Sequence, residues 1–214
     1  MKFAVILAGC GNKDGSEIQE AVLTLLSIDQ QLGAYQCFAP DISQVKTINF
    51  LTNEELPDRR SVLLESARIA RSDIKPLSDF NHQDFDVLVI PGGRGVALNL
   101  CTFAKDGVNM TVNADVKKAV LAMHKEGKPI GALCIAPVII AKLIPNVKLT
   151  FGDDQEVAAM FTAIGVKTIK ANADDVIVDE VNKIVTTPCY MVKTGPAQMY
   201  KGINNLIIAL KEMV

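Results

Sequence analysis

The chain of 214 residues is predicted to form one α/β domain, residues 1–214, with a mostly parallel, doubly wound sheet and helices on both faces. Two observations predict this class. Short apolar segments alternate with amphipathic helical patterns from start to finish. Several of the short segments are apolar at every position rather than at alternate ones, as expected of strands that are covered on both faces. No repeat, low-complexity tract or linker divides the chain.

The predicted strands are the short apolar segments. They are Lys2–Ala8, Tyr35–Ala39, Asp86–Ile90, Lys128–Leu133, Lys148–Phe151 and Val166–Lys170. The segment Val176–Thr186 has a different pattern, because two apolar stretches flank a polar turn at Asp179–Lys183. Such a pattern is typical of a β-hairpin. We therefore expect a small hairpin near the C-terminus.

The predicted helices lie between the strands and have apolar residues at helical spacing. They are Ser16–Leu32, Arg59–Ala70, Ala114–Glu126, Ile135–Leu143, Asp154–Ile164 and Ala197–Met213. The first has recognisable end signals. Ser16 with Gln19 three residues later forms a capping box, and Gly33 stands where a C-terminal cap is expected.

The composition excludes several classes of partner. Lys and Arg number 22 against 24 for Asp and Glu, the net charge is −2, and there is no tryptophan. Without a basic stripe, neither nucleic acid nor a membrane is expected as a partner. The cysteines are five, with no Cys-x-x-Cys pair, so we expect reduced thiols, no metal site and a cytoplasmic location. The first residues resemble a lipoprotein signal, but the apolar stretch Phe3–Ala8 is shorter than the ~7 residues that export needs.

Polar and reactive residues gather in loops that directly follow predicted strands. These loops cover residues 9–17, 91–95, 134–137 and 186–190. Ligands of doubly wound sheets bind beside the carboxyl ends of the strands. Since the four loops are expected to meet at that edge, the sequence predicts a site there.

Cys134 is the candidate nucleophile of this site. It follows a buried strand and directly precedes a helix, which is the setting of a nucleophile elbow. A helix N-terminus stabilises a thiolate. A small buried residue would explain the same pattern, so both interpretations stay open. Neither Cys10 nor Cys189 precedes a helix as directly. Both are expected to line the pocket, together with Asn12, Arg94 and Thr187.

Glu17 is the candidate partner of Cys134. An acid in the first turn of a helix is common because the helix dipole favours it, so a purely structural role also stays open. Beside a thiol in a poorly solvated pocket, however, a carboxyl would share one proton with the sulfur and could serve as general acid and base. The backbone N–H groups of Gly92 or Gly93 and of Ile135 are the expected donors to an oxyanion.

The only two histidines, His82 and His124, precede their strands and are expected at the opposite edge of the sheet. A Cys–His triad or a histidine-bound metal is therefore not expected.

A set of motifs runs along nearly the whole chain. They are Gly9-Cys10-Gly11, Asp14-Gly15-Ser16-Glu17-Ile18, Phe38-Ala39-Pro40-Asp41, Ser66-Ala67-Arg68-Ile69-Ala70-Arg71, Pro91-Gly92-Gly93, Gly127-Lys128-Pro129-Ile130-Gly131, Cys134-Ile135-Ala136-Pro137 and Thr186-Thr187-Pro188. These motifs, in this order, are similar to those of the ElbB-like family. Members of that family are named for enhanced lycopene biosynthesis or as isoprenoid-biosynthesis glyoxalases, within the PfpI-like, class I amidotransferase-like superfamily. The resemblance implies a flavodoxin-like fold, Cys134 as nucleophile and Glu17 as its carboxyl partner.

The chain departs from the pattern of that family around the expected pocket. Gln19 stands where histidine is usual, Arg94 where an aromatic residue is usual, Leu98 where lysine is usual and Cys189 where alanine is usual. These departures bear on substrate preference and rate more than on fold.

The activity that the resemblance implies is that of a glutathione-independent glyoxalase, a lyase that needs no cofactor. Cys134 would form a hemithioacetal with glyoxal, Glu17 would move a proton between the two carbons, and water would release glycolate. The expected partners are a small aldehyde substrate and a second copy of the chain in a homodimer. Two alternatives stay open: a redox-sensing or regulatory binding protein that uses an oxidisable Cys134, and an amidotransferase-like or protease-like hydrolase.

Overall fold

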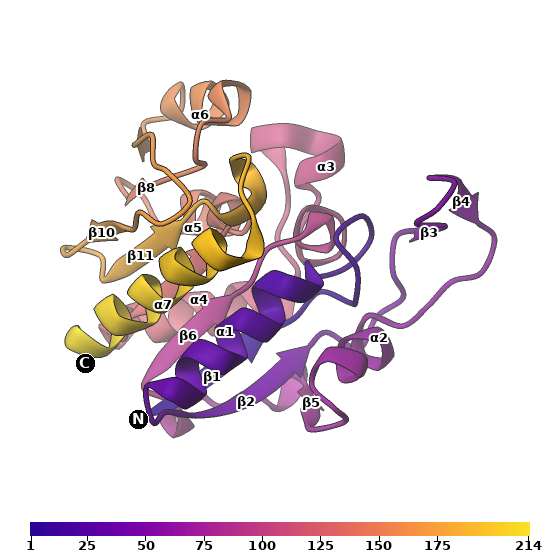
Figure 1. Ribbon diagram of the computed structural model, residues 1–214, viewed down its shortest axis with the longest axis horizontal. Helices are drawn as coiled ribbons and strands as arrows, with labels where there is room; N and C mark the ends of the chain where they lie inside the picture. Colours follow the sequence, from indigo (N-terminus) through magenta and orange to yellow (C-terminus); the bar gives the residue numbers. More distant parts are fainter.

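A computed structural model describes all residues from 1 to 214. Its centre is a seven-stranded sheet in the order β10-β11-β7-β6-β1-β2-β5 (Figure 1). The strands are β1 (Lys2–Ile6), β2 (Ala34–Ala39), β5 (Ile74–Pro76), β6 (Val87–Ile90), β7 (Ile130–Leu133), β10 (Ile177–Asp179) and β11 (Ile184–Thr187). All neighbours pair in parallel except β10 and β11, which form the hairpin predicted from the sequence. The flavodoxin-like α/β fold is confirmed.

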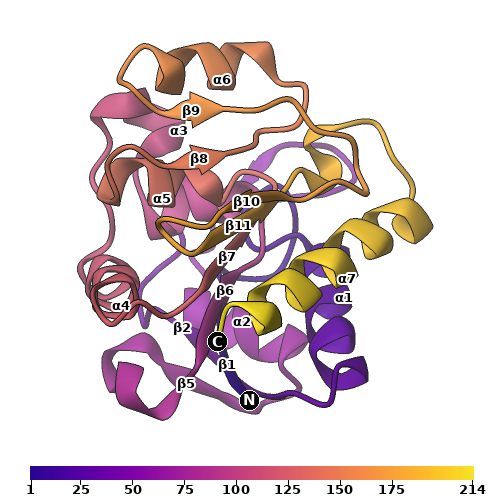
Figure 2. The ribbon, with the colours of Figure 1, turned by 90° about the vertical axis from the view of Figure 1, so that its left-hand side faces the viewer.

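Helices cover both faces of the sheet, as Figure 2 shows. One face is packed by α1 (Ile18–Gln30), α2 (Val62–Ile69) and α7 (Pro196–Glu212), and the other by α4 (Ala114–Lys125), α5 (Pro137–Leu143) and the π-helical segment η3 (Val96–Leu100). The remaining helical segments are α3 (Phe103–Asp106), α6 (Gln155–Thr162), η1 (Leu77–Asp79), η2 (His82–Asp84), η4 (Gly107–Asn109) and η5 (Cys189–Met191).

Strand β1 shows why the two layers form. Phe3 and Val5 pack into the core under α1 and α7, whereas Ala4 and Ile6 pack into the core under α4 and α5. All of them have no exposed surface. Burying each large side chain stabilises the fold by about 1.5–3 kcal/mol, so a strand that is apolar at every position needs cover on both sides.

The end signals predicted for the first helix are wrong in detail. Glu17, not Ser16, is the N-cap of α1, and its carboxylate accepts a hydrogen bond from the Glu20 N–H at 2.6 Å. The Ser16 hydroxyl instead accepts from the Ala8 N–H at 2.8 Å. At the other end Leu32 takes the left-handed conformation (φ 56°), and the Gly33 N–H donates to the Ile28 carbonyl. Gly33 therefore lies one residue beyond the position that usually needs glycine.

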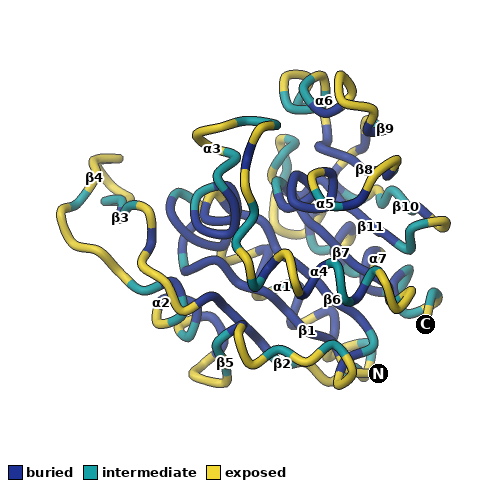
Figure 3. Tube along the Cα trace, turned by 180° about the vertical axis from the view of Figure 1, so that it is seen from behind, coloured by how far each residue is buried: buried dark blue, intermediate teal, exposed yellow.

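Some segments differ from the predicted elements. The short strands β8 (Lys148–Leu149) and β9 (Lys167–Thr168) pair with each other in a separate sheet instead of extending the central one. A further hairpin, β3 (Thr47–Ile48) and β4 (Glu55–Leu56), was not predicted. It projects from the body, and Figure 3 shows that much of it is exposed while the central strands are buried.

None of the helices combines the length and the apolarity that a membrane crossing requires.

Candidate active site

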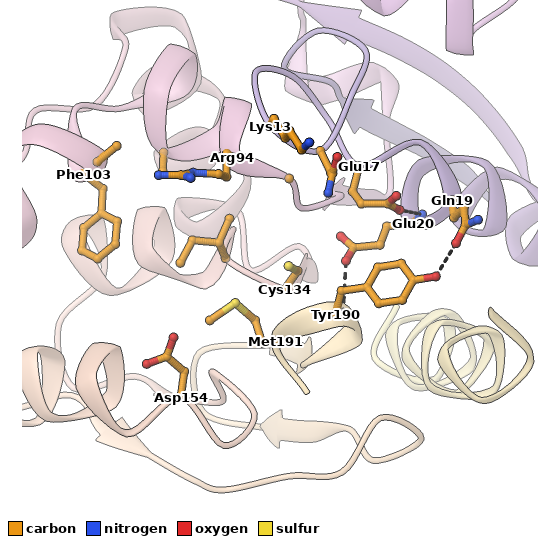
Figure 4. Close-up of a pocket in the computed structure, with 15 residues that line it drawn as sticks. Lys13, Glu17, Gln19, Glu20, Arg94, Phe103, Cys134, Asp154, Tyr190 and Met191 are labelled. Carbon is orange, nitrogen blue, oxygen red and sulfur yellow. Dashed lines mark hydrogen bonds between the residues drawn. The ribbon is translucent and has the colours of Figure 1, made fainter. Parts of the chain in front are cut away.

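The carboxyl ends of β1, β6, β7 and β11 lie side by side in the sheet, which brings together the four loops singled out from the sequence. A cavity of about 820 Å³ opens at this edge and contains Cys134 (Figure 4). Its lining residues are Asn12, Lys13, Glu17, Gln19, Glu20, Gly93, Arg94, Ala97, Phe103, Ala104, Cys134, Ile135, Asp154, Tyr190 and Met191.

Cys134 sits on a sharp turn between β7 and α5. Its backbone is left-handed (φ 58°), and its N–H donates to the Thr187 carbonyl at 3.0 Å. A left-handed conformation in a residue other than glycine is strained and persists only where the surroundings enforce it. The side chain is buried at the floor of the cavity, and the backbone N–H groups of Gly93 and Ile135 face its sulfur. This is the strand–turn–helix geometry predicted for a nucleophile elbow.

Glu20 is the carboxyl that contacts the Cys134 thiol. Its side chain has no exposed surface, although it accepts hydrogen bonds from the N–H groups of Gly92 at 3.0 Å and Tyr190 at 3.3 Å. Burial, together with the neighbouring charge of Glu17, raises the pKa of Glu20 to about 8. A carboxyl with such a pKa holds its proton at neutral pH.

The thiol of Cys134 is also difficult to ionise in its buried position. Burial and the adjacent Glu20 raise its pKa well above the usual value, while the N–H groups of Gly93 and Ile135 act in the opposite direction. Sulfur and carboxyl therefore form a coupled pair that loses its protons one at a time.

The structure corrects the carboxyl contact predicted from the sequence. Glu17 lines the same cavity, and burial raises its pKa, but its carboxylate is turned to the backbone N–H groups that begin α1. Glu20 lies one helical turn further on and reaches the thiol. The helix-start interpretation of Glu17 is thus confirmed, while a catalytic role for it stays a prediction.

Gly92 has a different role from the predicted one. Its N–H already donates to Glu20, so it is not free to hold an oxyanion. A Cβ on Gly92 would lie 2.4 Å from the Cβ of Cys134 and 2.5 Å from Oε2 of Glu20. Glycine is therefore required for the thiol and the carboxyl to approach. Gly93 and Ile135 keep the positions expected of oxyanion donors.

Only some of the predicted lining residues face the cavity. Asn12 and Arg94 do. Cys10 lies away from it, beside Asp14 and Arg68. Thr187 is fully buried, and its hydroxyl donates to the Asp175 carbonyl at 2.8 Å. Cys189 is also fully buried and packs in the same core as Cys134.

One feature of the sequence, the position of Glu20 on the apolar face of the first helix, could have identified this residue. Glu20 shares a face of α1 with Thr24 and Ile28, at a spacing of four residues, and all three are buried. A carboxyl on the apolar face of a helix is costly unless it is partnered, so it marks a candidate functional group. Nothing in the sequence pattern indicated Phe103, Asp154 or Met191, which all lie outside the four predicted loops.

Whether a metal site can be assembled depends on the placement of the side chains that commonly bind metals. No group of three or more His, Cys, Asp and Glu side chains is arranged to hold an ion. His82 and His124 precede β6 and β7, and neither lines the cavity, as predicted.

Comparisons with known proteins show the family of the chain. Residues 70–187 match the DJ-1/PfpI family. The chain is 37% identical, over 99% of its length and 83% of the relative, to "Glutamine amidotransferase-like class 1 domain-containing protein 3, mitochondrial" of Homo sapiens. Since that name places the human protein in mitochondria, the cytoplasmic location expected for this chain stays a prediction.

Solved structures show the same fold. An isoprenoid biosynthesis protein with an amidotransferase-like domain from Ehrlichia chaffeensis has a TM-score of 0.93 and 36% identity, with 100% of this chain and 99% of that one covered. A glyoxalase III from Candida albicans has a TM-score of 0.59 and 16% identity, with 98% and 97% covered, which is a likeness of fold alone. With a family match over residues 70–187 and relatives similar along almost the full length, this chain belongs to the DJ-1/PfpI family.

Proposed function

We propose that this protein is a cofactor-independent and glutathione-independent glyoxalase that converts glyoxal and related small dicarbonyls to 2-hydroxy acids. The observation that supports this most strongly is the contact between the buried Glu20 carboxyl and the Cys134 thiol, with the N–H groups of Gly93 and Ile135 beside the sulfur. A nucleophile, an acid/base group and an oxyanion site are all that the reaction needs. A protein named glyoxalase III, from Candida albicans, shares this fold.

In the first step the sulfur of Cys134 bonds to one carbonyl carbon of the substrate. The π electrons move to the oxygen, which the N–H groups of Gly93 and Ile135 stabilise until it takes a proton. The pair reacts after it has lost one of its two protons. The remaining proton passes through Glu20 to this oxygen, so that Glu20 ends the step as a carboxylate. The product is a hemithioacetal.

In the second step Glu20 as carboxylate removes the hydrogen of the sulfur-bearing carbon as a proton. The electron pair forms a carbon–carbon double bond, and the neighbouring carbonyl oxygen takes the proton of the hydroxyl on the sulfur-bearing carbon, which gives an enediolate. As the carbonyl of the sulfur-bearing carbon forms, Glu20 returns its proton to the neighbouring carbon. The sulfur-bearing carbon has thus been oxidised to a thioester and its neighbour reduced to an alcohol, with no external oxidant. Water cleaves the thioester, and glyoxal leaves as glycolate with the thiol restored.

The test is turnover of glyoxal to glycolate by the purified protein, followed by product detection. We expect turnover that is lost in Cys134→Ser, because the serine hydroxyl is a much weaker nucleophile than sulfur. Turnover should survive exhaustive chelation, because no step needs a metal. Absence of glycolate with the wild-type protein would refute the proposal, as would turnover retained in Cys134→Ser.

The alternatives have less support. A sensing thiol needs thiolate character and access, whereas burial raises the pKa of Cys134. A hydrolase that relies on imidazole would need a histidine, and none lines the cavity. A homodimer is also proposed, and light scattering in solution would test it.

A further inference from the structure

The cavity has one charged side chain without a partner in the protein. Four charged residues line it besides Glu20. Glu17 accepts a hydrogen bond from the Glu20 N–H. Asp154, the N-cap of α6, accepts a hydrogen bond from the Val157 N–H at 3.0 Å. The Lys13 ammonium donates to the Phe50 carbonyl at 3.1 Å and to the Asn53 side chain. The guanidinium of Arg94 makes no hydrogen bond or ion pair.

The backbone of Arg94 is firmly placed. Its N–H donates to the Asn12 carbonyl at 2.9 Å, and the Gly95 N–H donates to the Gly15 carbonyl at 2.8 Å. A Cβ on Gly93 would lie 2.2 Å from the Glu17 nitrogen, so the segment is pressed against the loop that follows β1. The side chain is exposed and lies between Lys13 and Phe103 in Figure 4, with Met191 and Asp154 across from it. The backbone of Arg94 is therefore fixed at the wall of the cavity, and its long cationic side chain extends from there.

The size of the cavity fits a substrate larger than glyoxal. Its volume of about 820 Å³ is in the range of about 300–1,000 Å³ that holds drug-sized ligands. Glyoxal has only two carbons and two oxygens. Apolar side chains, Phe103 and Met191 among them, line the space beyond Cys134 and would cover a short carbon chain.

We propose that Arg94 determines substrate specificity by binding a carboxylate at the far end of a 2-oxoaldehyde whose aldehyde reacts with Cys134. This inference rests on the proposed function and names its substrate class. Guanidinium groups bind carboxylates through paired, charge-assisted hydrogen bonds, and an arginine without a partner in the protein is free to make them. Arg94 is thus a binding residue for the part of the substrate that does not react.

A first experiment tests the cation without any turnover. Iodoacetate and iodoacetamide alkylate thiols by the same displacement and have similar size, but only iodoacetate carries a carboxylate. Their rates at Cys134 are measured by mass spectrometry of its peptide in the wild type, Arg94→Met, Arg94→Lys and Lys13→Met. We expect Arg94→Met to lower the ratio of iodoacetate to iodoacetamide rates by about 10-fold, roughly the size of one charge-assisted hydrogen bond.

Arg94→Lys should restore part of the ratio, because it keeps the charge without the fork of donors. Lys13→Met removes one cation from the same wall, but its ammonium is held elsewhere, so the ratio should change less than about twofold. An unchanged ratio in Arg94→Met, or an equal loss in Lys13→Met, would overturn the assignment.

A second experiment measures the specificity itself. Turnover of methylglyoxal is compared with that of 4,5-dioxopentanoate, which carries the distal carboxylate. The wild type should prefer the acid through a lower KM, and Arg94→Met should raise that KM about 10-fold with little change in kcat, since the bond is the same in ground and transition states. Equal KM values for the acid in both proteins would contradict the proposal. Conversion of glyoxal but of neither of these compounds by the wild type would also contradict it. If glyoxal is not converted either, the glyoxalase proposal fails, and the alkylation ratio alone decides whether Arg94 binds carboxylates.

Discussion

At the scale of single residues, the chemistry depends on where the proton of the Cys134–Glu20 pair resides. The pKa of Glu20 is about 8 and that of the thiol is raised as well, both through burial, so most molecules carry both protons of the pair at neutral pH. Attack by sulfur requires the loss of one proton. We therefore expect kcat/KM for glyoxal to rise with pH toward about 8 and then to level off, measured in the wild type over about pH 6–9. A flat profile would contradict the coupled pair.

The two glutamates of α1 provide a matched pair of variants at the same scale. Glu20→Gln keeps the size of the side chain but cannot exchange a proton, so turnover of glyoxal should fall about 10²–10⁴-fold with the fold intact. Glu17→Gln keeps an oxygen that can accept from the Glu20 N–H, so it should cost at most ~1 kcal/mol of stability, with a far smaller loss of turnover. Turnover and urea unfolding are measured for both. A larger loss in Glu17→Gln than in Glu20→Gln would return the acid/base role to Glu17.

At the scale of elements, the turn after β6 lets the thiol and the carboxyl meet. Gly92→Ala would place a Cβ 2.4 Å from the Cβ of Cys134 and 2.5 Å from Oε2 of Glu20. We expect a loss of about 1–3 kcal/mol in the free energy of unfolding and a near-complete loss of turnover, because overpacking a buried site forces side chains apart. Gly195→Ala is the control, since nothing lies within 4 Å of the added Cβ. Similar losses in both variants would show that the close packing of Cys134 and Glu20 against Gly92 is not required for turnover.

The strands also show which elements can be predicted from the sequence and which cannot. Strands β1, β6 and β7 were predicted because their apolar residues are continuous, a pattern that only burial on both faces explains. Strand β5 was missed, because it has three residues, ends in a proline and lies at the edge of the sheet. The position of Cys134 on the turn between β7 and α5 was predicted from local order along the chain.

The partner of Cys134 was not predicted, for a physical reason. The hydroxyl of Ser16 is used by the Ala8 N–H, so α1 begins after Glu17 rather than at Ser16. Which glutamate then faces the thiol depends on the rotation of α1 against the sheet. That rotation is fixed by long-range packing with α7. The spacing of Glu20, Thr24 and Ile28 marks the buried face of the helix, but it does not show which buried side chain meets the thiol.

At the scale of the whole molecule, the site is held together by the global fold. Cys134, Glu20 and Gly93 come from separate segments that meet only when β1, β6 and β7 are paired. The Tyr190 N–H that donates to Glu20 comes from beyond β11, the fourth neighbouring strand. The ionisation of the site and the stability of the molecule must therefore be linked.

This linkage predicts how stability depends on pH. An unfolded glutamate ionises near its ordinary pKa of 4.5, whereas folded Glu20 ionises at about 8. A raised folded-state pKa means that the stabilisation is fully present below the unfolded value and is lost as pH rises toward the folded one. Glu17 and Asp14, whose pKa values burial also raises, act in the same direction. The free energy of unfolding should therefore fall by a few kcal/mol between about pH 5 and pH 8.

The variant Glu20→Gln isolates the contribution of one residue to that slope. Glutamine has no charge to lose, so the fall in stability between about pH 5 and pH 8 should become much shallower than in the wild type. Glu17→Gln is the matched control, because Glu20 still titrates in it and most of the slope should remain. Urea unfolding at several pH values in this window measures all three proteins. If the wild type and Glu20→Gln give parallel curves, Glu20 does not retain its proton in the folded protein, and the proton shared with Cys134 must be sought elsewhere.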